Sequence, residues 1–270
     1  MRLIVKSQRK DDRLDARTLA RLARIDPELL SPVQHRSAQA QLHLAEIRAR
    51  AALVSTRTAL VNAARGLVKS YGERLPKCHT QQVHRETASE LSAELREALD
   101  PLLREVESLN ERIQEYDRRI ARMAKEQYPE TALLKQVKGV GDLIAATYVL
   151  TIEDPQRFRK SRDAGCFVGL QPGRRNSGES EPQLHISKEG DEYLRTLLVQ
   201  GAHYILGPFG EDCDLRRWGQ KLATRGGKNA KKRAVVAVAR KLAVLLHRLW
   251  VSGEVYEPLR NSHKATSTAA

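Results

Sequence analysis

The chain has 270 residues and a formal net charge of +14, from 47 Lys and Arg against 33 Asp and Glu. A hydrophobic content of 41% excludes a wholly disordered chain and is enough for a packed core. Aromatic residues make up only 4%, while Leu, Ala and Arg recur, which favours helix over sheet.

The cysteines and the charge narrow the class of protein further. Cys78, Cys166 and Cys213 form no CxxC pair, which excludes a zinc ribbon, and their odd, sparse count favours a reducing cytosol over a disulfide framework. No apolar run is long enough to span a membrane, and the N-terminus has no signal-peptide core. A protein of this charge most often binds a polyanion, so we expect a nucleic-acid partner.

The first candidate site lies near the N-terminus. Asp12 and Asp15 are three residues apart, which places both carboxylates on one face of a helix. Such a pair can ligate Mg²⁺, which prefers oxygen ligands and shares them with phosphate. The alternative is ordinary capping at a helix start, and the residues alone favour it.

The next part of the chain predicts two long helices. A stretch over 37–70 is rich in Ala, Leu and Arg, and 71–79 has the character of a turn. Apolar residues then alternate at spacings of four and three, which indicates a coiled-coil seam: Leu95, Leu99, Leu102, Val106, Leu109, Ile113, Tyr116, Ile120 and Met123. We expect an antiparallel hairpin with a kink or a helix start at Asp100-Pro101. A plain bundle core and a dimerisation or spacer element remain alternatives.

A helix-hairpin-helix pattern follows from Leu134 to Ala145. Gly139 and Gly141 permit a tight turn, and the amides at the start of the second helix can bind a DNA phosphate beside Lys138. These contacts would hold the DNA backbone without reading its sequence. A purely structural Gly-Val-Gly turn is the alternative.

Residues 165–180 read as a loop with a short apolar element at 166–170. Within it, Ser177 stands beside Gly178 and close to Arg174 and Arg175. A serine flanked by arginines could attack a phosphodiester, since guanidinium groups stabilise its extra charge in the transition state. A Ser-Gly pair is more often a simple turn.

Helical patterns return at 191–206 and 230–250. Lys188 and Arg195 could reach DNA phosphates, and His185 could assist proton transfer. The alternative is a capped helix with surface charges, and for His185 the residues favour it at least as much. A cationic cluster opens the last helix as a candidate phosphate contact: Lys228, Lys231, Lys232 and Arg233.

Charge is distributed unevenly along the chain. Residues 215–248 contain 11 Lys or Arg and no acid, whereas 85–130 contains 12 acids against 8 bases. We interpret the basic stretch as the DNA-binding part, with a solvated helix face as the alternative.

In combination these blocks resemble a known family, the DEDD insertion-sequence transposases of the IS110/IS1111 group. The matching blocks keep one order: Lys10-x-Asp12-x-x-Asp15-Ala16, the heptads, Lys138-Gly139-Val140-Gly141, Val168-Gly169-Leu170-x-Pro172 leading to Ser177-Gly178, and Ile186-x-Lys188-x-Gly190 followed by Leu194-Arg195. The resemblance covers almost the whole chain and strengthens the case for Ser177.

The resemblance implies an N-terminal RuvC-like domain in which four acids bind Mg²⁺, with Asp12 and Asp15 as the last two. A coiled coil and a domain with a nucleophilic serine, here Ser177, would follow. It also implies oligomers, here through the coiled coil, and an element-encoded guide RNA that pairs with DNA. The first two acids have no counterpart here, so we expect an N-terminally truncated chain that binds nucleic acid and is inactive alone.

The expected fold is therefore mainly α, in four parts: a RuvC-like remnant over 1–34, a helical hairpin over 35–128, a serine transposase domain over 129–258 and a disordered tail over 259–270. The expected function is strand cutting and rejoining in the bacterial cytoplasm, associated with the nucleoid and without membrane contact. Two other functions remain: a non-catalytic helix-hairpin-helix DNA-binding protein and a helical dimerisation scaffold.

Overall fold

A computed structural model describes residues 11–27, 35–173 and 184–261. The chain forms two compact units, Met1–Ser37 and Ala38–Ala270. The described residues are mainly helical and contain no strand, only an isolated antiparallel bridge between Pro172 and Ile186. The predicted mainly α class is confirmed.

The first unit contains one described helix, α2 (Asp12–Ile25). The Asp11 carboxylate caps its start by accepting a hydrogen bond from the Arg13 amide at 2.9 Å. Asp12 and Asp15 occupy the first turn and Arg24 the last, so these charges oppose the helix dipole at both ends. No residue of α2 is buried, so capping and charge, rather than packing, account for it in this unit.

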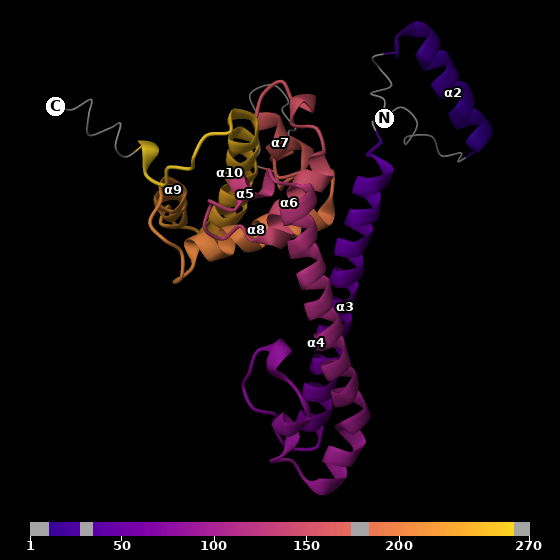
Figure 1. Cartoon of the computed structure of the whole chain (residues 1–270), viewed down its shortest axis with the longest axis vertical. Coiled ribbons are helices and arrows are strands. Elements are labelled where there is room, and N and C mark those ends of the chain that lie inside the picture. Colours follow the sequence, from indigo (N-terminus) through magenta and orange to yellow (C-terminus); the bar gives the residue numbers. More distant parts are fainter. Residues whose placement is uncertain (1–10, 28–34, 174–183, 262–270) are drawn as a thin grey trace, which may run out of the picture. The chain divides into compact units, whose positions relative to one another are not determined.

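The second unit begins with two long helices, α3 (Ala38–Ser70) and α4 (Ala93–Gln127), which lie side by side (Figure 1). Polar contacts between them keep a nearly constant sum of residue numbers, which is the register of an antiparallel pair. The contacts join Gln39 to Gln127, Glu46 to Arg119, Arg50 to Asp117, and Arg57 to Asn110. The expected antiparallel hairpin is thus present.

Most of the predicted apolar seam of α4 is buried. Leu95, Leu99, Val106, Leu109, Ile113, Ile120 and Met123 are buried, whereas Tyr116 and Leu102 are only partly so. Leu103 is buried where the pattern placed Leu102. At 100° per residue, Leu102 and Leu103 lie equally far from the direction midway between Leu99 and Val106, on opposite sides of it, so both pack at the seam, and Leu103 is the more deeply buried of the two.

Two details of the hairpin differ from the sequence prediction. The helix start expected at Asp100-Pro101 is wrong, because α4 begins at Ala93 and continues through Pro101. Proline removes one helical hydrogen bond, and burial of Leu99 and Leu103 on either side compensates for it. The connection is also longer than the expected turn: it spans residues 71–92 and contains η2 (Thr80–Gln82) and η3 (Arg85–Ala88).

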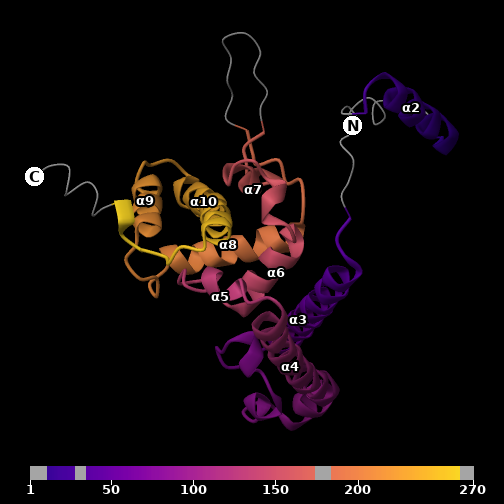
Figure 2. The same ribbon diagram turned by 45° about the horizontal axis from the view of Figure 1, so that its top comes forward.

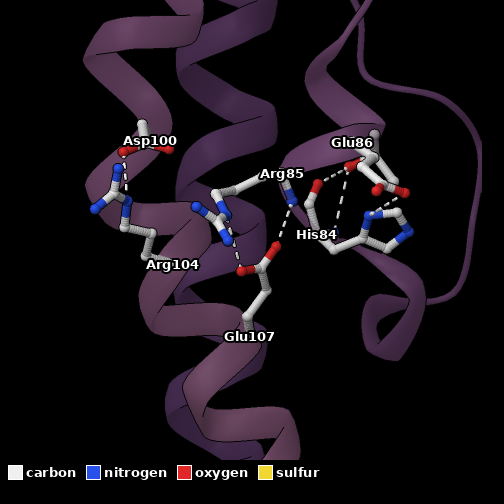
Figure 3. A network of polar contacts seen from close by, with 7 residues as sticks. His84, Arg85, Glu86, Asp100, Arg104 and Glu107 are labelled. Carbon is white, nitrogen blue, oxygen red and sulfur yellow. Dashed lines mark hydrogen bonds and ion pairs between the residues drawn. The ribbon is translucent and has the colours of Figure 1, made fainter.

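The long connection is fixed to α4 by charged contacts (Figure 3). Glu107 accepts hydrogen bonds from the Arg85 amide at 2.8 Å and from Arg85 Nε at 2.9 Å. These bonds, led by the one from the backbone, lower the pKa of Glu107. Arg104 pairs with Asp100 one turn away on the same helix, at 2.6 Å.

Shorter helices follow and pack around the last one (Figure 2). They are α5 (Thr131–Leu134), α6 (Asp142–Ile152), η4 (Pro155–Arg157), α7 (Arg162–Phe167), α8 (Glu192–Leu206), α9 (Asp214–Ala223) and α10 (Ala230–Ser252). α6 is buried from Ile144 to Ile152 and contacts both α3 and α4, so it attaches the hairpin to this helical group. Arg48 on α3 adds an ion pair to Asp191, the N-cap of α8, at 3.0 Å.

The predicted helices at 191–206 and 230–250 are confirmed as α8 and α10. The loop prediction from Gly165 is wrong at its start, because α7 extends through Phe167, where Gly165 packs against Arg240 of α10. The sequence analysis did not predict α9, which lies at the start of the basic stretch 215–248. Among the described residues, no helix combines the length and apolarity that crossing a membrane requires.

Candidate nucleic-acid interface

A groove of about 2000 Å³ opens on the second unit between α7, α9, α10 and the C-terminal segment. Its lining contains two acids, Asp214 and Glu257, and eleven basic residues. The basic residues are Arg162, Lys188, Arg217, Lys221, Arg225, Lys232, Arg233, Arg240, Lys241, Arg248 and Arg260. A concave wall with this excess of one charge concentrates the field and attracts a polyanion.

The basic side of the groove follows from the periodicity of α10. Its groove-lining cations recur at intervals of seven or eight residues, about two helical turns, and therefore share one side: Lys232, Arg233, Arg240, Lys241 and Arg248. The opposite side buries Val235, Val238, Leu242, Leu246 and Leu249 in the core. Burial of the apolar side turns the cationic side outward.

α9 forms the facing wall and adds the only tryptophan of the groove lining. Lys241 Nζ lies 3.8 Å from the centre of the Trp218 ring, a cation–π contact. Burial lowers the pKa of Lys241, because desolvation disfavours its charged form. Arg217 binds Asp212 at 2.6 Å, and this hydrogen bond lowers the pKa of Asp212.

One wall of the groove is a pair of chain segments, which we call the outgoing leg (168–173) and the returning leg (184–190). Backbone amides join them: Gly173 donates to His185 at 2.8 Å, Ser187 to Gln171 at 2.9 Å, and Lys188 to Gly169 at 3.1 Å. The predicted residues Arg174, Arg175 and Ser177 fall between the legs, in 174–183, outside the described residues. Pro172 on the outgoing leg and Leu184 on the returning leg both line the groove.

The predicted residues of the returning leg have different surroundings. Lys188 is exposed and lines the groove together with His185. Arg195, in the first turn of α8, is half-buried and does not line the groove. Its Nη1 donates to two backbone oxygens, Val168 at 3.1 Å and Glu189 at 3.0 Å.

The predicted helix-hairpin-helix segment packs closely against α8. Gly139 has φ +94°, and a Cβ there would lie 2.9 Å from Tyr204 and 3.2 Å from the Gly201 oxygen, so only glycine fits. Gly141 is the N-cap of α6 and has open space around it. Lys138 is exposed and pairs with Glu211 at 3.2 Å. The turn therefore lies at the surface, away from the groove lining.

The predicted metal ligands are placed on one helix. Asp12 is exposed and Asp15 half-exposed in the first turn of α2. Within the ranges that the structure describes, no cluster of three His, Cys, Asp or Glu side chains suits a metal ion. Two carboxylates alone bind Mg²⁺ weakly, so the described residues do not complete such a site.

Comparisons with known proteins identify the family. The family model described as "Transposase IS116/IS110/IS902 family" matches residues 131–209, and a DEDD transposase model of IS110 matches residues 1–73. The transposase of insertion sequence element IS1111A from Coxiella burnetii is 33% identical over 92% of this chain and 68% of its own length. The chain belongs to the IS110 family of transposases.

Further relatives agree with this assignment. A protein named "Probable family 20 transposase" from Pseudomonas aeruginosa is 30% identical over 92% of this chain and 74% of its own length. The transposase of IS1328 from Yersinia enterocolitica is 28% identical over 95% of this chain and 76% of its own length. The matches to the two family models cover α2, the whole of α3, the turn before α6 and both legs of the groove wall.

Sequence reasoning found part of the groove of this transposase and missed the rest. Among the predicted cations, Lys188, Lys232 and Arg233 line it, whereas Lys228 and Lys231 are exposed beside it. The residues missed come from several elements: Arg162, Arg217, Lys221, Arg225, Arg240, Lys241, Arg248 and Arg260. The acid-free stretch 215–248 was the available signal for six of them, but only α10 was read as a helix.

Proposed function

We propose that the basic groove binds the phosphate backbone of DNA and that this chain acts in DNA strand transfer within an insertion-sequence transposase. The observation that carries this proposal is the groove itself, with eleven cations against two acids on its lining. Each Lys or Arg that neutralises a phosphate releases a counterion, which favours binding independently of sequence. Membership of a transposase family makes DNA the appropriate polyanion.

We further propose Ser177 as the nucleophile. Its Oγ would lose its proton and form a bond to a DNA phosphorus while the P–O bond to one deoxyribose oxygen breaks. That oxygen would take up a proton as it leaves, and the phosphoserine would conserve the bond energy for rejoining. Ser177 is four residues from Gly173, so chain length limits the Cα separation to about 15 Å. A serine tethered this closely to the groove can reach DNA bound there.

Other predicted residues have supporting roles in this proposal. Arg174 and Arg175 would stabilise the transition-state charge with Lys188. Lys138 and the amides after Gly141 would hold a more distant stretch of DNA backbone, as in a helix-hairpin-helix module. The α3–α4 pair would act as a coiled coil that joins copies of the chain, and a guide RNA would pair with the DNA, as the family resemblance implies.

Asp12 and Asp15 are proposed as two of the Mg²⁺ ligands of a RuvC-like domain. In a complete site the metal would polarise the phosphate and stabilise the leaving oxygen. Two carboxylates alone bind the ion weakly, so further ligands would be needed to complete the site.

The first test of the proposal is the salt dependence of DNA binding. The 270-residue chain is titrated against a labelled duplex of about 30 base pairs between about 50 and 200 mM salt. If the groove neutralises six or more phosphates, affinity falls by about 10³-fold or more over this range. Weak binding that does not depend on salt would instead favour the helical scaffold.

The second test separates the transposase from a non-catalytic DNA-binding protein. The protein is incubated with element-end DNA and Mg²⁺, and the products are resolved by denaturing electrophoresis. We expect a covalent protein–DNA adduct that Ser177→Ala abolishes while DNA affinity is retained. An adduct that persists in Ser177→Ala would remove Ser177 from this role, and binding without any cleavage would favour the non-catalytic alternative.

A further inference from the structure

Arg195 occupies a special position between the two legs of the groove wall. One nitrogen, Nη1, donates to Val168 O in the first residue of the outgoing leg and to Glu189 O near the end of the returning leg. Arg195 thus joins the start of the outgoing leg to the end of the returning leg, and the three backbone hydrogen bonds join the residues between these points. A guanidinium held by two carbonyl oxygens in this way is directed at protein rather than at the groove.

The backbones at this point approach too closely for any side chain. A Cβ on Gly169 would lie 2.1 Å from Glu189 O, and one on Gly190 would lie 2.0 Å from Phe167 O. Both glycines have positive φ, +68° and +80°. The atoms that would clash are backbone atoms, so a flexible side chain could not relieve the contact. The two legs therefore pack backbone against backbone at this point, and Arg195 adds hydrogen bonds to both of them.

The returning leg also contains a strained residue. Lys188 has φ +58°, which is uncommon for a residue with a side chain, and it lies in the groove wall with His185. Such a conformation persists only where surrounding contacts enforce it. Two hydrogen bonds hold this part of the leg: the Lys188 amide donates to Gly169 O, and the Arg195 guanidinium donates to the neighbouring Glu189 O.

We propose that Arg195 is a positioning residue that holds the returning leg, and with it Lys188 and His185, in the wall of the basic groove. This role replaces the direct phosphate contact predicted from the sequence. Its DNA-binding consequence rests on the function proposed above, whereas its structural part does not. Loss of Arg195 would loosen both legs and remove Lys188 from the geometry in which it meets DNA.

The structural part is tested by amide hydrogen exchange of the full chain without DNA. Arg195→Ala should raise exchange at least tenfold in peptides covering 168–173 and 184–190, while peptides of α10 keep wild-type rates. Gly190→Ala should give the same pattern, because it separates the legs without removing a charge. Arg195→Lys, which keeps a donor near the carbonyls, should restore part of the protection. Arg96→Ala on the exposed surface of α4 is the matched control and should change nothing.

The binding part is tested by a double-mutant cycle on duplex affinity. Arg195→Ala should weaken binding about tenfold, and Lys188→Ala added to it should cause little further loss, because Lys188 is already displaced. Additive losses, together with wild-type exchange in both legs, would show that Arg195 binds phosphate directly and would overturn the proposal. A rise of exchange throughout α8 and α10 would show only a general loss of stability and would also overturn it.

The two measurements can fail separately. If Arg195→Ala raises amide exchange in the legs but the wild-type chain does not bind DNA, the proposed function is contradicted and the positioning role stands. Normal exchange with salt-dependent DNA binding would contradict the positioning role and leave the proposed function intact.

Discussion

The helical hairpin and the basic groove use charge in opposite ways. Along α3 and α4, cations meet acids of the same hairpin: Arg50 binds Asp117, Arg119 binds Glu46, and Arg85 binds Glu107. In the groove, eleven cations share a lining with two acids. Matched charges set the register of two helices, whereas the groove keeps an excess of cations even though Arg217 pairs with Asp212 and Arg260 with Glu254, and such an excess attracts an external anion. The comparison explains how one chain can carry a large net charge and still fold.

The largest test reverses charge in the groove. Lys232→Glu combined with Arg240→Glu should lower duplex affinity on the order of 10³-fold, because each change removes an attraction and adds a repulsion. Fluorescence anisotropy at fixed salt measures the loss. The matched hairpin variant, Arg96→Glu with Arg104→Glu, carries the same charge change and should stay within about twofold of wild type. Equal losses in both variants would mean that only net charge matters.

A second test removes apolar packing from the hairpin. Leu103→Ala on α4 deletes a side chain that is 1% exposed and should lower the free energy of unfolding by about 2–5 kcal/mol. Urea unfolding followed by circular dichroism measures this change. The salt dependence of DNA binding by the folded variant should match wild type. A change in that dependence would mean that the hairpin itself contacts DNA.

A third test compares single cations of the two regions. Lys241→Ala should reduce the slope of log affinity against log salt by about 0.9, the amount expected for one phosphate contact. Arg119→Ala, which removes a cation paired with Glu46, should leave the slope unchanged. Identical slopes for Lys241→Ala and wild type would show that Lys241 supports the Trp218 ring and does not meet phosphate.

The smallest effect concerns pH and the hairpin. The pKa of Glu107 is held below its ordinary value of 4.5, so its contacts stabilise the fold above that pH and are lost as pH falls through the lowered value. Glu107→Gln should remove this part of the acid dependence, at most about 1 kcal/mol for a partly exposed pair. Thermal melts between about pH 3 and 7 measure it. Glu94→Gln, in the first turn of the same helix, serves as the comparison.

Much of this fold could be predicted because local pattern and tertiary burial agree. α8 and α10 carry apolar residues at helical spacing, and their sequence boundaries hold to within two residues. Prediction failed where a local signal was outweighed by packing. Pro101 signals a break, but the buried leucines around it keep α4 continuous. Gly165 signals a loop, but its missing side chain allows α7 to approach Arg240 of α10.

The candidate site was predictable only in part for a related reason. The acid-free stretch from 215 to 248 is visible in sequence, and it contains most of the cations that line the groove. Arg162 and Arg260 lie far from that stretch along the chain and join it only through folding. Arg195 carries the same charge as the groove cations, and nothing in its sequence context shows that its guanidinium binds two carbonyl oxygens. The number of charged residues can be counted from the sequence, but the groups that each charged side chain contacts cannot be read from it.

The sequence by itself determined the helical class, the family, the antiparallel hairpin and the basic character of residues 215–248, since these depend on periodicity, composition and ordered motifs. The tertiary structure decided which cations share one concave surface, which are matched by acids, and which, like Arg195, bind the protein's own backbone. These outcomes depend on distances between residues far apart in the chain, which packing of the core alone fixes.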